Sequence, residues 1–197
     1  KGNFKYFDWE EVSNASEKVI ISRTGFTNEL GWEIYLRPEN NAKKIGDLIL
    51  EKGKRMGMML TASPGFRGRR IEAGLLSAGR DFTKDRTPFS VGLGKFIDFD
   101  KGDFIGRDHL LKANKDCLTW GLRVKDSYAL VDSDLSINNN KVGKVTSSTW
   151  SPYQVCGVSI VHMKNNSFGP GTLVDVLCED GNIHIGEICN LPMYDSK

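Results

Sequence analysis

The sequence has almost no net charge. Its 27 lysine and arginine residues balance 25 aspartate and glutamate residues, which gives a formal charge of +2 over 197 residues. A balance this even produces no general attraction to nucleic acid or to a membrane surface, so electrostatic recognition has to be local. We therefore expect no nucleic-acid partner and no membrane partner.

The sequence also has no apolar run long enough to cross a bilayer and no recognisable signal peptide. It begins at Lys1 without a methionine, and its first residues lead toward a strand, so we expect a fragment or a processed chain. The hydrophobic content of 39% is enough for a buried core, and the length suits one or two domains.

Paired cysteines are missing too. Cys117, Cys156, Cys178 and Cys189 lie far apart, and none forms a CxxC motif. Because their neighbours are apolar or strand-like, we expect small buried thiols instead of disulfides or a metal site. Unpaired thiols are typical of a reducing compartment, so we expect a cytoplasmic protein.

The histidines give no metal-binding motif either. His109, His162 and His184 are scattered, and no second ligand stands at metal spacing. His162 and His184 lie in strand-like runs, where we expect hydrogen-bonded strand histidines. We predict no metal site.

Two strand-like runs lie near the N-terminus. Residues 18–24 (KVIISRT) and 31–37 (GWEIYLR) are rich in β-branched and aromatic residues. The connector between them contains Gly25 and Asn28, both of which favour turns. The pattern predicts a β-hairpin.

Helical spacing follows in three segments. Residues 40–57 carry apolar residues on one face and basic residues late, as an amphipathic helix does. Residues 68–79 predict a second helix that stops at Gly79, and residues 105–114 predict a short third one.

The pattern changes after about residue 115 to short β runs separated by turn residues, which is typical of a sandwich or a small barrel. The runs are residues 117–126, 141–149, 155–163, 172–178 and 182–190. We predict an α+β fold, with an antiparallel sheet and packed helices in residues 1–114 and an all-β barrel or sandwich domain in residues 115–197. The boundary is expected near residues 113–115.

The second strand-like run alternates in a way that raises a question of function. Trp32, Ile34 and Leu36 are spaced to bury one face, which leaves Glu33 and Tyr35 on the other. The simpler interpretation is a solvated sheet face. The alternative is a slot for a flat heterocycle, in which the carboxylate accepts from an amino edge and the aromatic rings exclude water.

Three arginines form a second candidate site. Arg67, Arg69 and Arg70 lie at the start of the predicted second helix. They could be solvated, or they could strengthen an anion site at the helix N-terminus. A ligand with a heterocyclic head and an acidic tail would use both clusters, and folate is such a ligand.

Several blocks, in order from about Ile20 to the C-terminus, resemble the second half of the aminomethyltransferase (glycine-cleavage T-protein) family. They are SRTGFTNELGWEIY, RRIEAGLLSAGRDFT, TPFSVGLGKFIDFDKGDFIGRDHLL and KVGKVTSSTWSP. The segments ELGWEIY and DKGDFIGRDHLL are similar to the folate-binding portions of dimethylglycine and sarcosine dehydrogenases. The blocks LLSAGRD and ICNLPMY are similar to dimethylsulfoniopropionate demethylase, another member of the family.

The resemblance implies a tetrahydrofolate site. It assigns the pterin contact to Glu33, with Phe26 lining the site and Tyr35 as a further wall, and it places a family arginine at Arg70. Trp32 lies beside Glu33 and completes the predicted set of folate-binding residues. The family's catalytic aspartate belongs to the first half of the longer protein, so we assign no catalytic residue here.

The sequence departs from the family pattern in three places. Phe26 stands where tyrosine is frequent, Ala78-Gly79 replaces a tyrosine-glycine pair, and the hairpin reads NEL instead of GED or GEL. The implied function is one-carbon transfer to tetrahydrofolate from an aminomethyl, methylated-amine or sulfonium donor. Partners implied are a small one-carbon donor and an upstream domain or carrier protein.

Two other functions stay open at this point. One is a non-catalytic folate-binding regulator on the same scaffold. The other is an RNA- or protein-binding module that uses the arginine cluster, although the low net charge argues against RNA.

Overall fold

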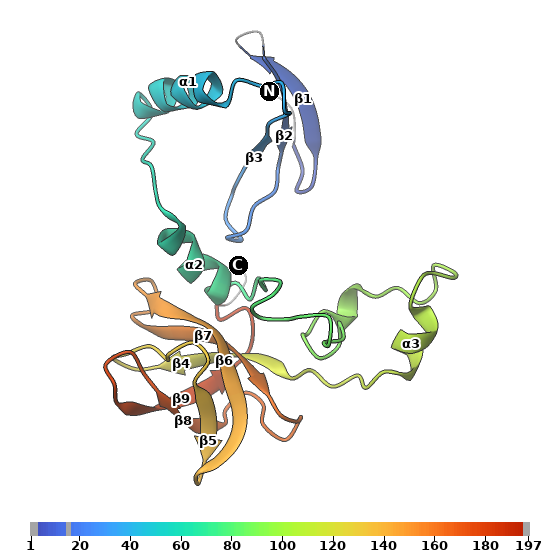
Figure 1. The fold of residues 1–197 in the computed structure, drawn as a ribbon, viewed down its shortest axis with the longest axis vertical. Helices are drawn as coiled ribbons and strands as arrows, with labels where there is room; N and C mark the ends of the chain where they lie inside the picture. Colours follow the sequence, from blue (N-terminus) through green and yellow to red (C-terminus); the bar gives the residue numbers. More distant parts are fainter. Residues whose placement is uncertain (1–3, 15–16, 195–197) are drawn as a thin grey trace. The chain divides into compact units, whose positions relative to one another are not determined.

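The computed structural model describes residues 4–14 and 17–194 (Figure 1). The chain divides into two compact units, Lys1–Phe66 and Arg67–Lys197. Residues 67–114 therefore belong to the same compact unit as the C-terminal strands. The division of the protein into a folate-binding portion ending at residue 114 and a following β domain stays a prediction.

The first unit contains a three-stranded antiparallel sheet in the order β1-β2-β3. Its strands are β1 (Trp9–Asn14), β2 (Glu17–Ser22) and β3 (Glu33–Tyr35). The antiparallel pairing of β2 with β3 confirms the predicted hairpin. Helix α1 (Ala42–Lys54) confirms the predicted amphipathic helix, and the Asn41 side chain caps it by accepting from the Lys44 N–H at 3.0 Å.

The predicted burial of one face of β3 is wrong. Trp32, Ile34 and Leu36 are 40% to 50% exposed. The reason is the length of the strand, because β3 pairs over only three residues and leaves Trp32 and Leu36 outside the ladder. Alternation holds a side chain to one face only where the backbone is paired.

Helix α2 (Ser63–Glu72) ends earlier than the sequence pattern predicted. Gly74 adopts a φ of 71°, its N–H bonds to the Ile71 carbonyl, and the Leu75 N–H bonds to the Arg70 carbonyl. This pair of bonds is a Schellman motif, in which a glycine at positive φ ends the helix. The expected stop at Gly79 is therefore wrong by five residues, and Gly79 lies in a later turn at a φ of 79°.

A 3-10 turn and one short helix follow α2 before the C-terminal strands begin. They are η1 (Gly94–Phe96) and α3 (Arg107–Lys112), and α3 confirms the predicted third helix.

The remaining strands close into a six-stranded antiparallel barrel in the order β4-β7-β6-β5-β8-β9, with β9 paired back to β4 (Figure 1). The strands are β4 (Thr119–Val124), β5 (Asp134–Ile137), β6 (Asn140–Ser151), β7 (Cys156–Met163), β8 (Leu173–Leu177) and β9 (Ile183–Cys189). Their inward side chains form the main core, which includes Leu122, Leu135, Val145, Val161 and Ile188. The α+β class with a terminal barrel is confirmed.

A second, smaller core holds the end of α2 against the barrel. Ile71 of α2 packs with Val158 and Ile160 of β7 and with Met193 of the C-terminal segment. This contact fixes the position of the last turn of α2, where Arg69 and Arg70 lie.

Candidate functional site

Glu33 lies at the start of β3, directly opposite Ser22 of β2. Its Oε2 atom accepts hydrogen bonds from the Thr24 hydroxyl and, at 3.1 Å, from the Tyr35 hydroxyl. Thr24 Oγ1 also lies 3.1 Å from Ser22 Oγ, which ties the group to β2. Within residues 4–14 and 17–194, nothing donates a hydrogen bond to Oε1 of Glu33, and the residue is exposed. One carboxylate oxygen is thus held in place, while the other is left without a donor among the described residues.

The register of the sheet decides which side chains share a face with Glu33. Residues directly opposite each other on antiparallel strands point to the same side, and the sides alternate along the strand. Glu33 and Tyr35 therefore lie on one face, as predicted. Trp9 pairs with Ser22, so it stands in the same row as Glu33. Trp9 was not among the predicted site residues, because the pairing of β1 cannot be read from spacing alone.

Trp32 is held by neighbours of its own. Its ring meets the Phe4 ring edge-on at 5.0 Å between centroids, and the Arg23 guanidinium lies 5.6 Å from its centroid. Arg23 also donates to the Phe4 carbonyl at 3.1 Å. These contacts give Trp32 a structural role at the entry to β3. Phe26 lies exposed in the connector between β2 and β3.

The arginine cluster lies at the opposite end of its helix from the predicted one. Helix α2 begins at Ser63, so Arg69 and Arg70 occupy its last turn. The prediction of an anion site at a helix N-terminus is therefore wrong. The free carbonyl groups at a helix C-terminus favour cations, which explains why arginines suit this position.

Arg70 belongs to a buried polar network. It is 7% exposed, and its Nη1 atom donates at 2.8 Å to the carboxylate of Asp81, which is 2% exposed. Nη1 also donates to the Leu75 carbonyl at 2.8 Å, and Nη2 donates to Ser147 Oγ of β6 at 2.7 Å. Asp81 further accepts at 2.6 to 2.8 Å from the Ser77 N–H and from the hydroxyls of Thr146 and Ser147. The network links α2, the following loop and the barrel.

A second network surrounds Glu72, which is buried at the end of α2. Its carboxylate accepts from Arg69 and, at 2.5 Å, from the Ser151 hydroxyl. The Arg69 guanidinium lies 5.2 Å from the ring centroid of Tyr153 and 5.6 Å from that of Tyr194. Pairing and hydrogen bonding make burial of this carboxylate possible.

His162 is a hydrogen-bonded strand histidine, as predicted. Its Nε2 lies 2.5 Å from Arg86 Nη1, and its Nδ1 lies 3.1 Å from Thr119 Oγ1. Since arginine can only donate, Nε2 must accept and Nδ1 carries the proton. Burial and the neighbouring Arg86 charge lower the pKa of His162 from 6.5 to about 4. The ring is therefore neutral near pH 7.

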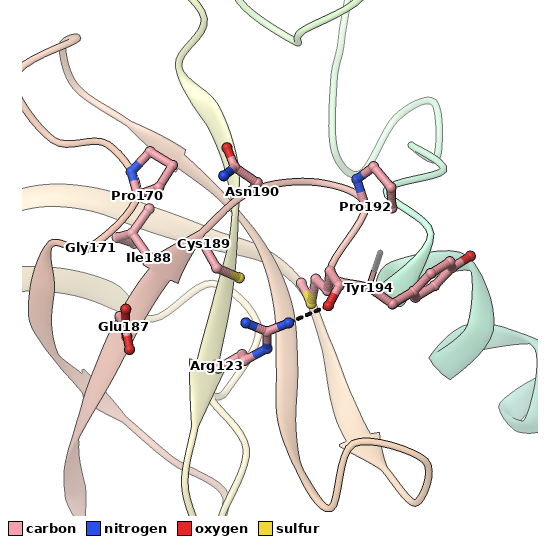
Figure 2. A pocket seen from close by; sticks show the side chains of 10 residues that line it. Arg123, Pro170, Gly171, Glu187, Ile188, Cys189, Asn190, Pro192 and Tyr194 are labelled. Carbon is pink, nitrogen blue, oxygen red and sulfur yellow. Dashed lines mark hydrogen bonds between the residues drawn. The ribbon is translucent and has the colours of Figure 1, made fainter. Parts of the chain in front are cut away.

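Three cavities lie elsewhere in the two units. One of about 430 Å³, shown in Figure 2, lies beside β4 and β9, where Arg123 donates to the Met193 carbonyl. Another, of about 460 Å³, is bordered by Ala78, Arg86 and Leu93, and one of about 510 Å³ lies along α1. None of these three is lined by Glu33 or Arg70. No group of three or more potential metal ligands occurs in the part of the chain that the structure describes.

Comparison with protein families identifies the class. Residues 1–101 match the family described as "GCVT N-terminal domain". The chain is 30% identical to an aminomethyltransferase of Halothermothrix orenii, a match that covers 96% of this chain and 54% of that protein. It is 37% identical to the aminomethyltransferase of Caldanaerobacter subterraneus over 76% of this chain and 40% of that protein. A trimethylamine-oxide aldolase of Ruegeria pomeroyi is 32% identical over 83% of this chain and 21% of that protein.

A solved structure agrees with these matches. The crystal structure of glycine cleavage system aminomethyltransferase T from Bartonella henselae superposes with a TM-score of 0.81 at 25% identity, over 98% of this chain and 54% of that chain. The chain belongs to the aminomethyltransferase (glycine-cleavage T-protein) family, which confirms the resemblance. It spans about half the length of the first-named relative and of the Bartonella structure.

Proposed function

We propose that this chain is the tetrahydrofolate-binding part of a folate-dependent one-carbon transferase. The observation that carries the proposal is Oε1 of Glu33, which accepts no hydrogen bond within the described residues, on a carboxylate whose other oxygen is held by Thr24 and Tyr35. A carboxylate fixed in this way on the sheet of this chain can accept hydrogen bonds from the amino edge of a ligand. The transferase names of most of the relatives reported above favour this function over a non-catalytic regulator.

The residues present fit a reduced pterin. Its exocyclic amine and adjacent ring N–H are donors, and a carboxylate accepts such bonds at a gain of about 1.5–3 kcal/mol each when water is excluded. Oε1 offers a free acceptor, and Oε2 would stay oriented by Tyr35. Phe26 and Tyr35 supply exposed aromatic surface from the same hairpin, and we keep Trp32 in the proposed site as a ring fixed by Phe4 and Arg23.

Arg70 is the second residue that the resemblance assigns to folate. Its assignment to folate binding rests on the resemblance and stays a prediction. Both of its Nη atoms form hydrogen bonds inside the second unit, with Asp81 and Ser147. These bonds support a structural contribution of Arg70 to that unit, in addition to any contact with an acidic ligand.

The contribution of this chain to catalysis would be orientation. Tetrahydrofolate supplies the amine that accepts the one-carbon unit. Glu33 would hold the amino edge, Tyr35 would hold Glu33, and the aromatic rings would keep water from the ring face. Holding two reactants in the correct relative orientation can lower an activation barrier by as much as about 7–11 kcal/mol in favourable systems.

The donor belongs to a small set of chemical classes. We propose a small aminomethyl, methylated-amine or sulfonium donor, presented either free or on a carrier protein. The similarity to a protein named trimethylamine-oxide aldolase supports methylated amines as one class. All four cysteines are free thiols, which supports the proposed cytoplasmic location. No helix in the described residues is long and apolar enough to span a bilayer.

The test is calorimetry of tetrahydrofolate binding to the wild-type chain and to the Glu33→Ala variant. Loss of one charge-assisted hydrogen bond should weaken binding at least tenfold, which corresponds to about 1.4 kcal/mol. Glu10→Ala is the matched control, because Glu10 lies on strand β1 of the same sheet, opposite Ile21 and therefore on the other face. Equal affinities for wild type and Glu33→Ala would remove Glu33 from the ligand site.

A further inference from the structure

We propose that Trp9 is a specificity-determining residue of the same site and stacks on the flat ring whose amino edge Glu33 binds. The inference rests on the proposed function and extends it, because it names the residue that selects a planar bicyclic ring. It is carried by the register of β1, β2 and β3, by the contrast between Trp9 and Trp32, and by the charges on the sheet face.

The register places Trp9 in one row with Ser22 and Glu33. Since neighbouring strands lie about 4.8 Å apart, the Cα atoms of Trp9 and Glu33 are separated by about 10 Å across β2. The next row on the same face contains Ile20 and Tyr35. The first row therefore has the small Ser22 between two large side chains, whereas the second has Ile20 between Glu11 and Tyr35.

Ser22 has the smallest side chain of the Trp9 row. It is buried, and its hydroxyl lies 3.1 Å from that of Thr24. Trp9 on β1 is 67% exposed and Tyr35 on β3 is 50% exposed. In the proposed pose, a flat ring that binds Glu33 by one edge lies across β2 toward Trp9.

Trp9 differs from Trp32 in what holds its ring. Trp32 is packed by Phe4 and Arg23. Among residues 4–14 and 17–194, no aromatic ring or cation contacts the Trp9 ring, and the residue is 67% exposed. An indole offers a large rigid surface for stacking and loses little conformational entropy on binding.

The charges on this face favour a ligand that donates hydrogen bonds. Glu11, in the Tyr35 row, is paired with Arg37 and lies 3.6 Å from Lys18. Glu33 forms no ion pair with any Lys, Arg or His of the described chain. The uncompensated carboxylate beside an open indole therefore suits a neutral heterocycle with an amino edge.

The test compares two ligands by calorimetry on the full 197-residue chain. Tetrahydrofolate contains the bicyclic ring, and p-aminobenzoylglutamate is its tail without that ring. Trp9→Ala should raise the Kd for tetrahydrofolate at least fivefold, whereas Trp9→Phe should stay within threefold of wild type because a ring is kept. The Kd for p-aminobenzoylglutamate, where measurable, should change less than twofold. Phe96→Ala, which removes an exposed ring in the second unit, is the control.

The outcomes separate the two proposals. If Glu33→Ala weakens tetrahydrofolate binding while Trp9→Ala binds like wild type, this inference is overturned and the proposed function stands. If Trp9→Ala and Trp9→Phe lose affinity equally, or if both ligands are affected alike, stacking is refuted. If the wild-type chain shows no saturable binding of tetrahydrofolate, both proposals fail. Far-UV circular dichroism of each variant excludes loss of fold as the cause.

Discussion

Asp81→Ala should be among the most destabilising single changes in the second compact unit. The substitution removes the carboxylate that pairs with the buried guanidinium of Arg70, whose other acceptors include Leu75 and Ser147. It also deprives the Ser77 N–H and the Thr146 hydroxyl of an acceptor. Breaking a buried ion pair by removing one partner costs about 3–5 kcal/mol. For a chain of this size, that loss lowers the melting temperature by about 6–20 °C.

The measurement is thermal unfolding followed by near-ultraviolet circular dichroism, which reports the aromatic residues of the barrel. Asp85→Ala is the matched control, because the Asp85 carboxylate is 68% exposed and lies 4.0 Å from Arg86. Its loss should change stability by less than about 1 kcal/mol. A double-mutant cycle with Arg70→Ala then isolates the pair. A coupling free energy below about 1 kcal/mol, or equal melting temperatures for Asp81→Ala and Asp85→Ala, would refute the reasoning.

Two further predictions concern Arg70 and His162. Arg70→Lys should lower the melting temperature, because an ammonium group cannot reproduce the fork that bonds Asp81 and Ser147. The same variant should weaken tetrahydrofolate binding less than Glu33→Ala does. An unchanged melting temperature in thermal unfolding would argue against this role of Arg70. The lowered pKa of His162, about 4 against an ordinary 6.5, means that the unfolded chain binds the extra proton first as the pH falls. The wild type should therefore lose about 2 kcal/mol more stability between pH 7 and pH 5 than His162→Asn does, as measured by urea unfolding at both pH values; identical pH dependence would contradict the assignment.

Five of the six barrel strands were predictable from the sequence. The runs that became β4, β6, β7, β8 and β9 are dense in β-branched residues. Strand β5 was missed, since its four residues, Asp134–Ile137, include two polar side chains and give too short a pattern. Closure of β9 onto β4 was not predictable, because register is a property of the whole sheet.

The end of α2 shows a different limit of sequence patterns. Apolar spacing continued to Ala78, but Gly74 can adopt positive φ at little cost and ended the helix there. The glycine thus ended the helix although the apolar spacing continued beyond it. Because the helix also begins earlier than expected, at Ser63, Arg69 and Arg70 lie in its last turn and not in its first.

The candidate site was predictable only where it is local. The hairpin brings Thr24, Glu33 and Tyr35 together within a few residues of chain, and the sequence pattern already indicated that Glu33 and Tyr35 share a face. The partner of Arg70 lies 11 residues away and Ser147 lies 77 residues away, and no spacing rule connects them. Trp9 was missed for the same reason, because its relation to Glu33 passes through β2.

Burial separates the two acidic residues that matter most in this chain. Asp81 accepts four hydrogen bonds inside the protein and has nothing left to offer a ligand. Glu33 is exposed and uses one oxygen for its neighbours, so its removal leaves no charge stranded in the core. The same change to alanine should therefore act on stability at Asp81 and on affinity at Glu33. If Glu33→Ala unfolded the protein and Asp81→Ala left the fold intact, the binding chemistry would lie in the buried network instead.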